Sequence, residues 1–161
     1  MESFAEIRQT MFPTRANRAE PLIVSKPVIL VIDDNVDIME SLTNVLESSY
    51  QLIACSNYEE AKRFLLPEIK VVLLDIKMAE KDGIEVYKLL KEDREDLRII
   101  FHSAYPGDSE KALEIEHLGH NGYLIKGEYQ RPELFATIES ALNQEGAGTT
   151  IRRSKSKKRN S

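Results

Sequence analysis

The sequence contains a single cysteine, and this scarcity limits the chemistry that is open to the chain. Cys55 has no second cysteine with which to form an intrachain disulfide, a composition that suits a reducing compartment. We expect Cys55 to be a small buried residue rather than a catalytic thiol.

Long apolar runs are absent as well. No stretch of the sequence approaches the roughly 18 consecutive apolar residues of a transmembrane helix. Glu2, Glu6 and Arg8 fall among the first residues, where a signal peptide would have its apolar core. We therefore expect a cytoplasmic protein that makes no contact with membranes.

Acidic residues are missing from the C-terminal end and are concentrated in the middle of the chain. Residues 27–145 hold 24 of the 27 Asp and Glu residues against 12 Lys and Arg, whereas residues 146–161 have six basic residues and no acidic one. We expect 27–145 to be one domain and 146–161 to be a basic disordered tail, because the tail has no apolar periodicity. Six charges without aromatic residues are only a weak signal for nucleic-acid contact. Residues 1–26 are expected to be an extension and linker, with a short helix between Ser3 and Pro13.

Strand-like and helix-like segments alternate through the middle of the chain. Asn57 and Asp82 are positioned to cap two of the helices, and Pro132 to open the last one. Each helix signature follows a short apolar run of strand length, and these runs are residues 28–32, 50–55, 71–75, 97–103 and 122–126. Five such pairs without an internal repeat predict an α/β fold with a doubly wound parallel sheet.

Polar side chains end four of the predicted strands. Asp33 and Asp34 follow the first strand, Asp75 ends the third, and Ser103 and Lys126 end the fourth and fifth. In an open parallel sheet these ends meet at one edge, where ligands bind. Three neighbouring carboxylates raise one another's pKa unless a cation is present. A divalent ion with oxygen ligands, which we expect to be Mg²⁺, removes that penalty, and the lysine and hydroxyl suggest a bound phosphoryl group.

The same residues resemble the receiver domain of two-component response regulators. The acidic pair Asp33–Asp34, the run D-x-x-M-x-x-x-D-G from Asp75 to Gly83, the pair Ser103–Ala104 and Lys126 stand in that family's order and spacing. The resemblance covers roughly three quarters of the chain and implies the flavodoxin-like strand order 2-1-3-4-5. It does not extend to either end of the chain.

The resemblance implies a phosphoryl acceptor and a metal site. Asp75 would take a phosphoryl group from a phosphohistidine of a histidine kinase or a histidine phosphotransfer protein. Asp34, Asp75 and the backbone carbonyl of Lys77 would bind Mg²⁺ directly, and Asp33 would contribute through water.

The resemblance also implies a conformational switch. Lys126 would pair with the phosphoryl oxygens, and Ser103 would donate its hydroxyl to them. Tyr123 stands at the position of the family's aromatic switch residue, which moves inward as the serine approaches the phosphoryl group. Ordinary packing is the alternative for Tyr123. The output would be a surface that binds a downstream protein target.

Two residues depart from the family's pattern. Gly127 stands where a proline usually follows the lysine, and we expect it to leave the next turn less constrained. Ala79 replaces the proline that commonly follows the methionine of the D-x-x-M run, and we expect it to loosen that loop.

We interpret the chain as a single-domain response regulator, a signalling protein rather than an enzyme. Nothing after residue 145 is long enough to form a DNA-binding or enzymatic output domain. The alternatives are a phosphorylation-independent adaptor with a receiver-like fold and a receiver fragment of a longer regulator. A Mg²⁺-dependent phosphohydrolase is less favoured, because no acidic residue stands two positions after Asp75.

Overall fold

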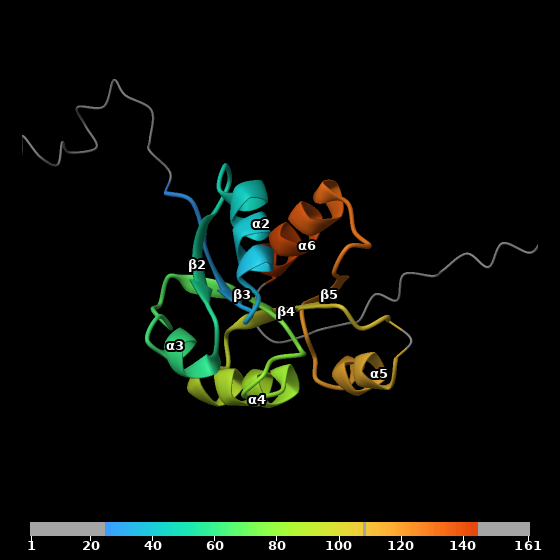
Figure 1. Ribbon diagram of the computed structural model, residues 1–161. Helices are drawn as coiled ribbons and strands as arrows, with labels where there is room; N and C mark the ends of the chain where they lie inside the picture. The colour runs from blue at the N-terminus through green and yellow to red at the C-terminus, as the bar shows by residue number, and fades with distance from the viewer. Residues whose placement is uncertain (1–24, 108, 145–161) are drawn as a thin grey trace, which may run out of the picture.

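The computed structural model describes residues 25–107 and 109–144. Within them, five parallel strands form one sheet in the order β2-β1-β3-β4-β5, which confirms the predicted fold and strand order (Figure 1). The strands are β1 (Val28–Ile32), β2 (Gln51–Cys55), β3 (Ile69–Leu74), β4 (Arg98–Ser103) and β5 (Gly122–Ile125). The helices that alternate with them are α2 (Val36–Leu46), α3 (Tyr58–Lys62), α4 (Gly83–Asp93), α5 (Glu110–Glu116) and α6 (Arg131–Asn143). The helix predicted between Ser3 and Pro13 and the predicted basic tail lie outside the described residues.

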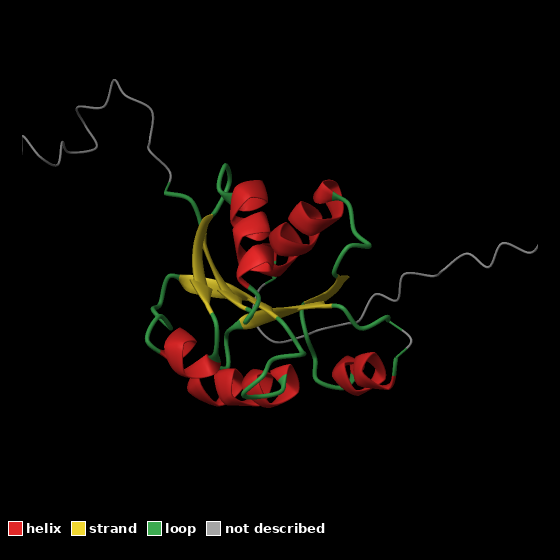
Figure 2. Ribbon diagram, in the orientation of Figure 1, coloured by secondary structure: helices red, strands yellow, loops and turns green. Residues whose placement is uncertain are grey.

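Helices cover both faces of the sheet. α2 and α6 lie on one face, and α3, α4 and α5 lie on the other (Figure 2). A strand that is covered on both faces has to be apolar at nearly every position, and Ile29 to Ile32 of β1 are accordingly no more than 1% exposed. Among the residues that the structure describes, no helix combines the length and the apolar character that a bilayer crossing requires.

The strand order brings the ends of β1 and β3 together. The chain passes from β1 to β2 on one side and then returns to β3 on the other side of β1, and Ile32 pairs with Cys55 and with Leu74. Such a reversal opens a crevice at the carboxyl ends of the strands. β3 begins at Ile69 and ends at Leu74, so Asp75 is the first residue after the strand rather than its last one.

Short polar residues cap four of the described helices, with Ser109 at the start of α5. The side chain of Asn35 accepts two backbone N–H groups of the first turn of α2, and Asn57 and Asp82 cap α3 and α4 as predicted. Because Asn35 caps α2, neither Asp33 nor Asp34 is needed as the cap. These two carboxylates, which could have served as caps, are therefore left for the edge of the sheet.

Candidate functional site

Three carboxylates meet at the carboxyl ends of β1 and β3. Ligand oxygens of Asp33, Asp34 and Asp75 all lie within 4.8 Å of one another. The backbone N–H of Asp75 donates to the carbonyl of Ile32 at 2.9 Å, which continues the strand pairing and fixes Asp75 beside the acidic pair. Asp33 is 1% exposed and Asp75 is 4% exposed, whereas Asp34 is exposed to solvent. The structure thus brings together the three carboxylates that the sequence predicted, two of them buried.

Lys126 reaches two of these carboxylates from the end of β5. Its backbone N–H donates to the carbonyl of Ser103 at 2.8 Å, which places it at the same edge of the sheet. Its Nζ lies 2.7 Å from Oδ2 of Asp33 and 3.2 Å from Oδ1 of Asp75. A lysine among buried carboxylates compensates part of their charge.

One lysine does not neutralise the site. Burial raises the pKa of Asp75 to about 6; the charge of Asp33 adds to the rise and Lys126 opposes it. Two carboxylates facing a single ammonium group leave net negative charge among the described side chains. A divalent cation with oxygen ligands fits this donor set, and Mg²⁺ requires only one or two direct carboxylates.

The other hydrogen bonds distinguish the two members of the acidic pair. Asp33 accepts from Lys126 on one oxygen and from the backbone N–H of Asn35 at 2.9 Å on the other. Asp34 accepts the backbone N–H of Ala79 at 2.9 Å on Oδ2. Since both oxygens of Asp33 are engaged, an indirect contact with a metal suits Asp33 better than a direct one.

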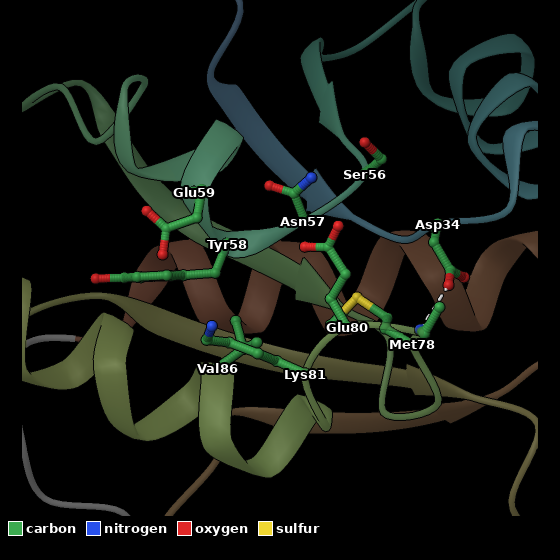
Figure 3. Close-up of a pocket in the computed structure, with 10 residues that line it drawn as sticks. Asp34, Ser56, Asn57, Tyr58, Glu59, Met78, Glu80, Lys81 and Val86 are labelled. Carbon is green, nitrogen blue, oxygen red and sulfur yellow. Dashed lines mark hydrogen bonds between the residues drawn. The ribbon is translucent and has the colours of Figure 1, made fainter.

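The segment after β3 lies beside the cluster and is tied to it. Lys77 is exposed in this segment, two residues after Asp75. We expected Ala79 to loosen the loop, yet its N–H holds Asp34, a bond that proline could not donate. Figure 3 draws this bond at one side of a pocket lined by Asp34, Asn57 and Met78, among other residues of the segments that follow β1, β2 and β3. The exposed side of the site is therefore framed by loops of three strands.

Gly83 explains the last two residues of the D-x-x-M-x-x-x-D-G run. Its N–H donates to the carbonyl of Ile76 at 2.7 Å, and a Cβ atom built on it would lie 2.3 Å from the carbonyl oxygen of Asp75. Only glycine allows α4 to begin so close to the backbone of Asp75. Asp82 caps α4 and pairs with Lys111 of α5 at 2.9 Å. The sequence reasoning identified this run, but not the close approach that requires the glycine.

Ser103 and Tyr123 lie near each other and both contact Tyr105. Ser103 is fully buried, and its Oγ accepts the backbone N–H of Tyr105 at 3.1 Å. The hydroxyl of Tyr123 donates to the carbonyl of Tyr105 at 2.9 Å. Burial raises the pKa of Tyr123, and the nearby Ser103 hydroxyl offsets part of the rise. A change at Ser103 would therefore be felt by Tyr123 through one shared residue.

His102 and Tyr129 form a polar contact to which the sequence reasoning gave no function. His102 is 3% exposed, and its Nε2 lies 2.8 Å from the hydroxyl of Tyr129. Burial lowers the pKa of His102 to about 4, with a further lowering by Lys126 and an opposing effect of Asp33. A histidine inside an apolar strand was the one available signal, and nothing in the sequence pointed to its partner 27 residues later.

Comparison with known proteins gives a consistent family. Residues 29–139 match the family model described as the response regulator receiver domain. The transcriptional regulatory protein CssR of Bacillus subtilis (strain 168) is 30% identical over 115 residues, which cover 71% of this chain and 50% of CssR. The chain spans about half the length of the curated relatives it matches.

Solved structures support the same family. A response regulator receiver domain protein from Clostridium thermocellum is 26% identical with a TM-score of 0.66, over 74% of this chain and 95% of that one. CheY in a complex with CheX, beryllofluoride and Mg²⁺ from Borrelia burgdorferi has 25% identity and a TM-score of 0.64, over 73% and 90% of the two chains. Since residues 29–139 include all of the polar positions at the carboxyl edge of the sheet, the chain belongs to the response regulator receiver domain family.

Proposed function

We propose that this receiver domain accepts a phosphoryl group on Asp75 from a phosphohistidine of a histidine kinase or a histidine phosphotransfer protein. The observation that carries the proposal is the contact of Lys126 with Asp75 inside a cluster of three carboxylates. A half-buried lysine beside a carboxylate of raised pKa is an arrangement suited to phosphoryl transfer. A purely structural ion pair would not need a third carboxylate, whose charge repels the other two.

The cluster also supports a metal requirement. We infer that Asp34, Asp75 and the backbone carbonyl of Lys77 bind Mg²⁺ directly, and that Asp33 contributes through water. Bound there, Mg²⁺ would neutralise charge on the transferring phosphoryl oxygens. The Borrelia burgdorferi relative is described as a complex with beryllofluoride and Mg²⁺, which agrees with this inference.

The transfer itself needs little from the protein beyond positioning. A carboxylate oxygen of Asp75 forms a bond to phosphorus while the phosphorus–nitrogen bond of the phosphohistidine breaks. The electron pair of that bond leaves with the imidazole, which takes up a proton from water. Lys126 keeps its contact with Asp33 and turns its other hydrogen bonds to the phosphoryl oxygens, where the new charge develops.

The signal would leave the site through Ser103. Its Oγ accepts the N–H of Tyr105, and a phosphoryl oxygen on Asp75 would offer its O–H a charged acceptor. We infer that Ser103 turns to that acceptor and releases Tyr105, whose carbonyl holds the hydroxyl of Tyr123. Tyr123 is then free to rotate inward, which changes the surface between α5 and β5 that a protein partner binds.

The output has two candidates. We favour a separate protein target, as a single-domain regulator would use. The curated relatives are transcriptional regulatory proteins of about twice the matched length, which favours a domain attached to a longer regulator as the second candidate. A nucleic-acid contact through the basic residues of 146–161 would be weak and would fall steeply with added salt.

The proposal is tested by the mass of the intact protein after incubation with acetyl phosphate and Mg²⁺. We expect the mass of one added phosphoryl group in the wild type and no addition in Asp75→Asn. Asp37→Asn is the matched control. Asp37 is exposed on the first turn of α2, so its replacement should leave the reaction unchanged. An unmodified wild type, also with the cognate kinase, would leave the phosphorylation-independent adaptor as the better account.

A further inference from the structure

Lys126 depends on the turn that follows it. It extends from the end of β5, at the edge of the sheet, to Asp33 at the end of β1, and the strand order puts the ends of β4 and β3 between them. A side chain that spans two strand ends is sensitive to where its own backbone lies. Small shifts of the turn from Lys126 to Tyr129 would therefore move Nζ away from the carboxylates.

The first half of this turn is held by backbone contacts. Lys126 donates to the carbonyl of Ser103, and the N–H of Glu128 donates to the carbonyl of Ile125 at 3.0 Å. Gly127 has a φ of +80°, a left-handed conformation that glycine adopts without strain at the third position of a β-turn. The second half joins α6, where the N–H groups of Glu133 and Leu134 donate to the carbonyl of Gln130, but the Gln130 side chain makes no cap hydrogen bond.

Tyr129 connects the second half of the turn to the sheet. Its hydroxyl contacts Nε2 of His102 at 2.8 Å, and the two rings meet edge to face with centroids 5.5 Å apart. His102 comes from β4, so this contact joins the turn to the centre of the sheet. His102, Tyr129 and Lys126 also line one cavity between α2 and α6.

His102 and Tyr129 are uncharged groups that lie beside Lys126. We propose that His102 and Tyr129 are positioning residues whose hydrogen bond holds the turn and so keeps Lys126 on Asp33 and Asp75. His102 is uncharged at neutral pH, so it does not compete with Lys126 for the carboxylates. The inference rests on the proposed function, because it assigns the pair to the reaction at Asp75.

Tyr129→Phe removes the hydrogen bond and keeps the ring. We expect phosphorylation of Asp75 by acetyl phosphate to slow roughly 2- to 10-fold, the equivalent of one neutral hydrogen bond. His102→Leu should slow it equally, and the double variant should be no slower than either single one, because both remove the same bond. His102→Gln, which offers Tyr129 an amide, should recover most of the rate.

Tyr50→Phe is the matched control. Tyr50 is a buried tyrosine on the same face of the sheet, but it precedes β2 and packs against Phe135 of α6. It should react like the wild type. The inference is overturned if Tyr129→Phe reacts at the wild-type rate, or if it slows no more than Tyr50→Phe.

A second measurement separates this inference from the proposed function. The ammonium protons of a lysine held by carboxylates exchange slowly enough to be followed by NMR, and no phosphorylation is needed to observe them. We expect the Lys126 ammonium signal in the wild type and Tyr50→Phe and its loss in Tyr129→Phe. If wild-type Asp75 takes no phosphoryl group but this difference is found, the proposed function fails and the positioning of Lys126 stands. An unchanged signal in folded Tyr129→Phe overturns the positioning itself.

Discussion

Asp75 carries the proposed chemistry, and its surroundings oppose its ionisation. It is buried beside Asp33, and its pKa rises to about 6 from the usual 3.8. The folded protein therefore binds a proton at Asp75 more tightly than the unfolded chain does. This preference stabilises the fold below pH 4 and is lost as the pH rises through about 6.

The comparison of Asp75→Asn with the wild type measures this effect, because asparagine resembles the protonated carboxyl group. Without Mg²⁺, the variant should exceed the wild type in free energy of unfolding by on the order of 2 kcal/mol at pH 7. The difference should shrink towards zero near pH 4. Urea unfolding in EDTA across this range provides the measurement, and Mg²⁺ should reduce the gap at pH 7. A gap that is the same at every pH would contradict the raised pKa.

Ser103 is the residue through which we propose that this charge reaches the rest of the domain. We expect Ser103→Ala to permit phosphorylation of Asp75 but to stop its effect on Tyr123. Alanine has no hydroxyl that could turn from the N–H of Tyr105 to the phosphoryl group. Amide chemical shifts recorded with beryllofluoride and Mg²⁺ provide the measurement. In the wild type and in exposed Ser41→Ala the changes should extend to residues 105–126, and in Ser103→Ala they should remain around Asp75. Wild-type changes confined to the loops would mean that the output lies on another face.

At the scale of elements, the close approach of α4 to the end of β3 positions the backbone of Asp75. The backbone atoms that a Cβ at Gly83 would meet belong to Asp75 and Ile76. They cannot move without moving the Asp75 carboxylate. Replacing glycine by alanine in a helix ordinarily stabilises it by about 1 kcal/mol. At Gly83 the steric conflict with the Asp75 backbone turns this stabilisation into a destabilisation.

Gly83→Ala should therefore lower the free energy of unfolding by on the order of 1–3 kcal/mol, the usual effect of overpacking. It should also slow phosphorylation, because the added methyl group displaces the backbone of Asp75. Gly107→Ala is the matched control: its Cβ would meet only a side-chain methyl of Ile125, at 3.9 Å. Denaturant unfolding of both variants checks this. Equal stability of the two would show that α4 adapts without disturbing the site.

At the scale of the whole molecule, charge is divided unevenly along the chain. Residues 27–145 carry a formal charge of about −12 and residues 146–161 about +6. The acidic part includes the cluster at the edge of the sheet, and the basic part lies outside the described residues. Opposite charges of this size attract at low ionic strength whether or not they form a defined contact.

Deleting residues 146–161 tests whether the basic segment contributes to folding. We expect the free energy of unfolding to change by less than about 0.5 kcal/mol and the phosphorylation of Asp75 to persist, because the segment offers no apolar face to bury. Thermal unfolding at low and high salt provides the measurement, and the 161-residue chain with the six basic residues of 146–161 changed to serine is the control. A large loss of stability that disappears in high salt would mean that the segment binds the acidic domain.

The sequence by itself determined the fold class and the composition of the site. Alternating apolar runs and helix signatures predict the parallel sheet, because a strand covered on both faces has no polar positions to spare. Polar residues directly after four strands predict the edge at which Asp33, Asp34, Asp75, Ser103 and Lys126 meet. These features are local in sequence, so periodicity and spacing are enough to find them.

The tertiary structure decided what depends on contacts between distant segments. It buries Asp33 and leaves Asp34 exposed, although the two are adjacent and identical in sequence. It makes glycine necessary at Gly83, where a helix meets the backbone of another segment, and it joins His102 to Tyr129 across 27 residues. Burial, close approach and the pKa of Asp75 all depend on what surrounds a residue in space, and sequence spacing does not carry that information.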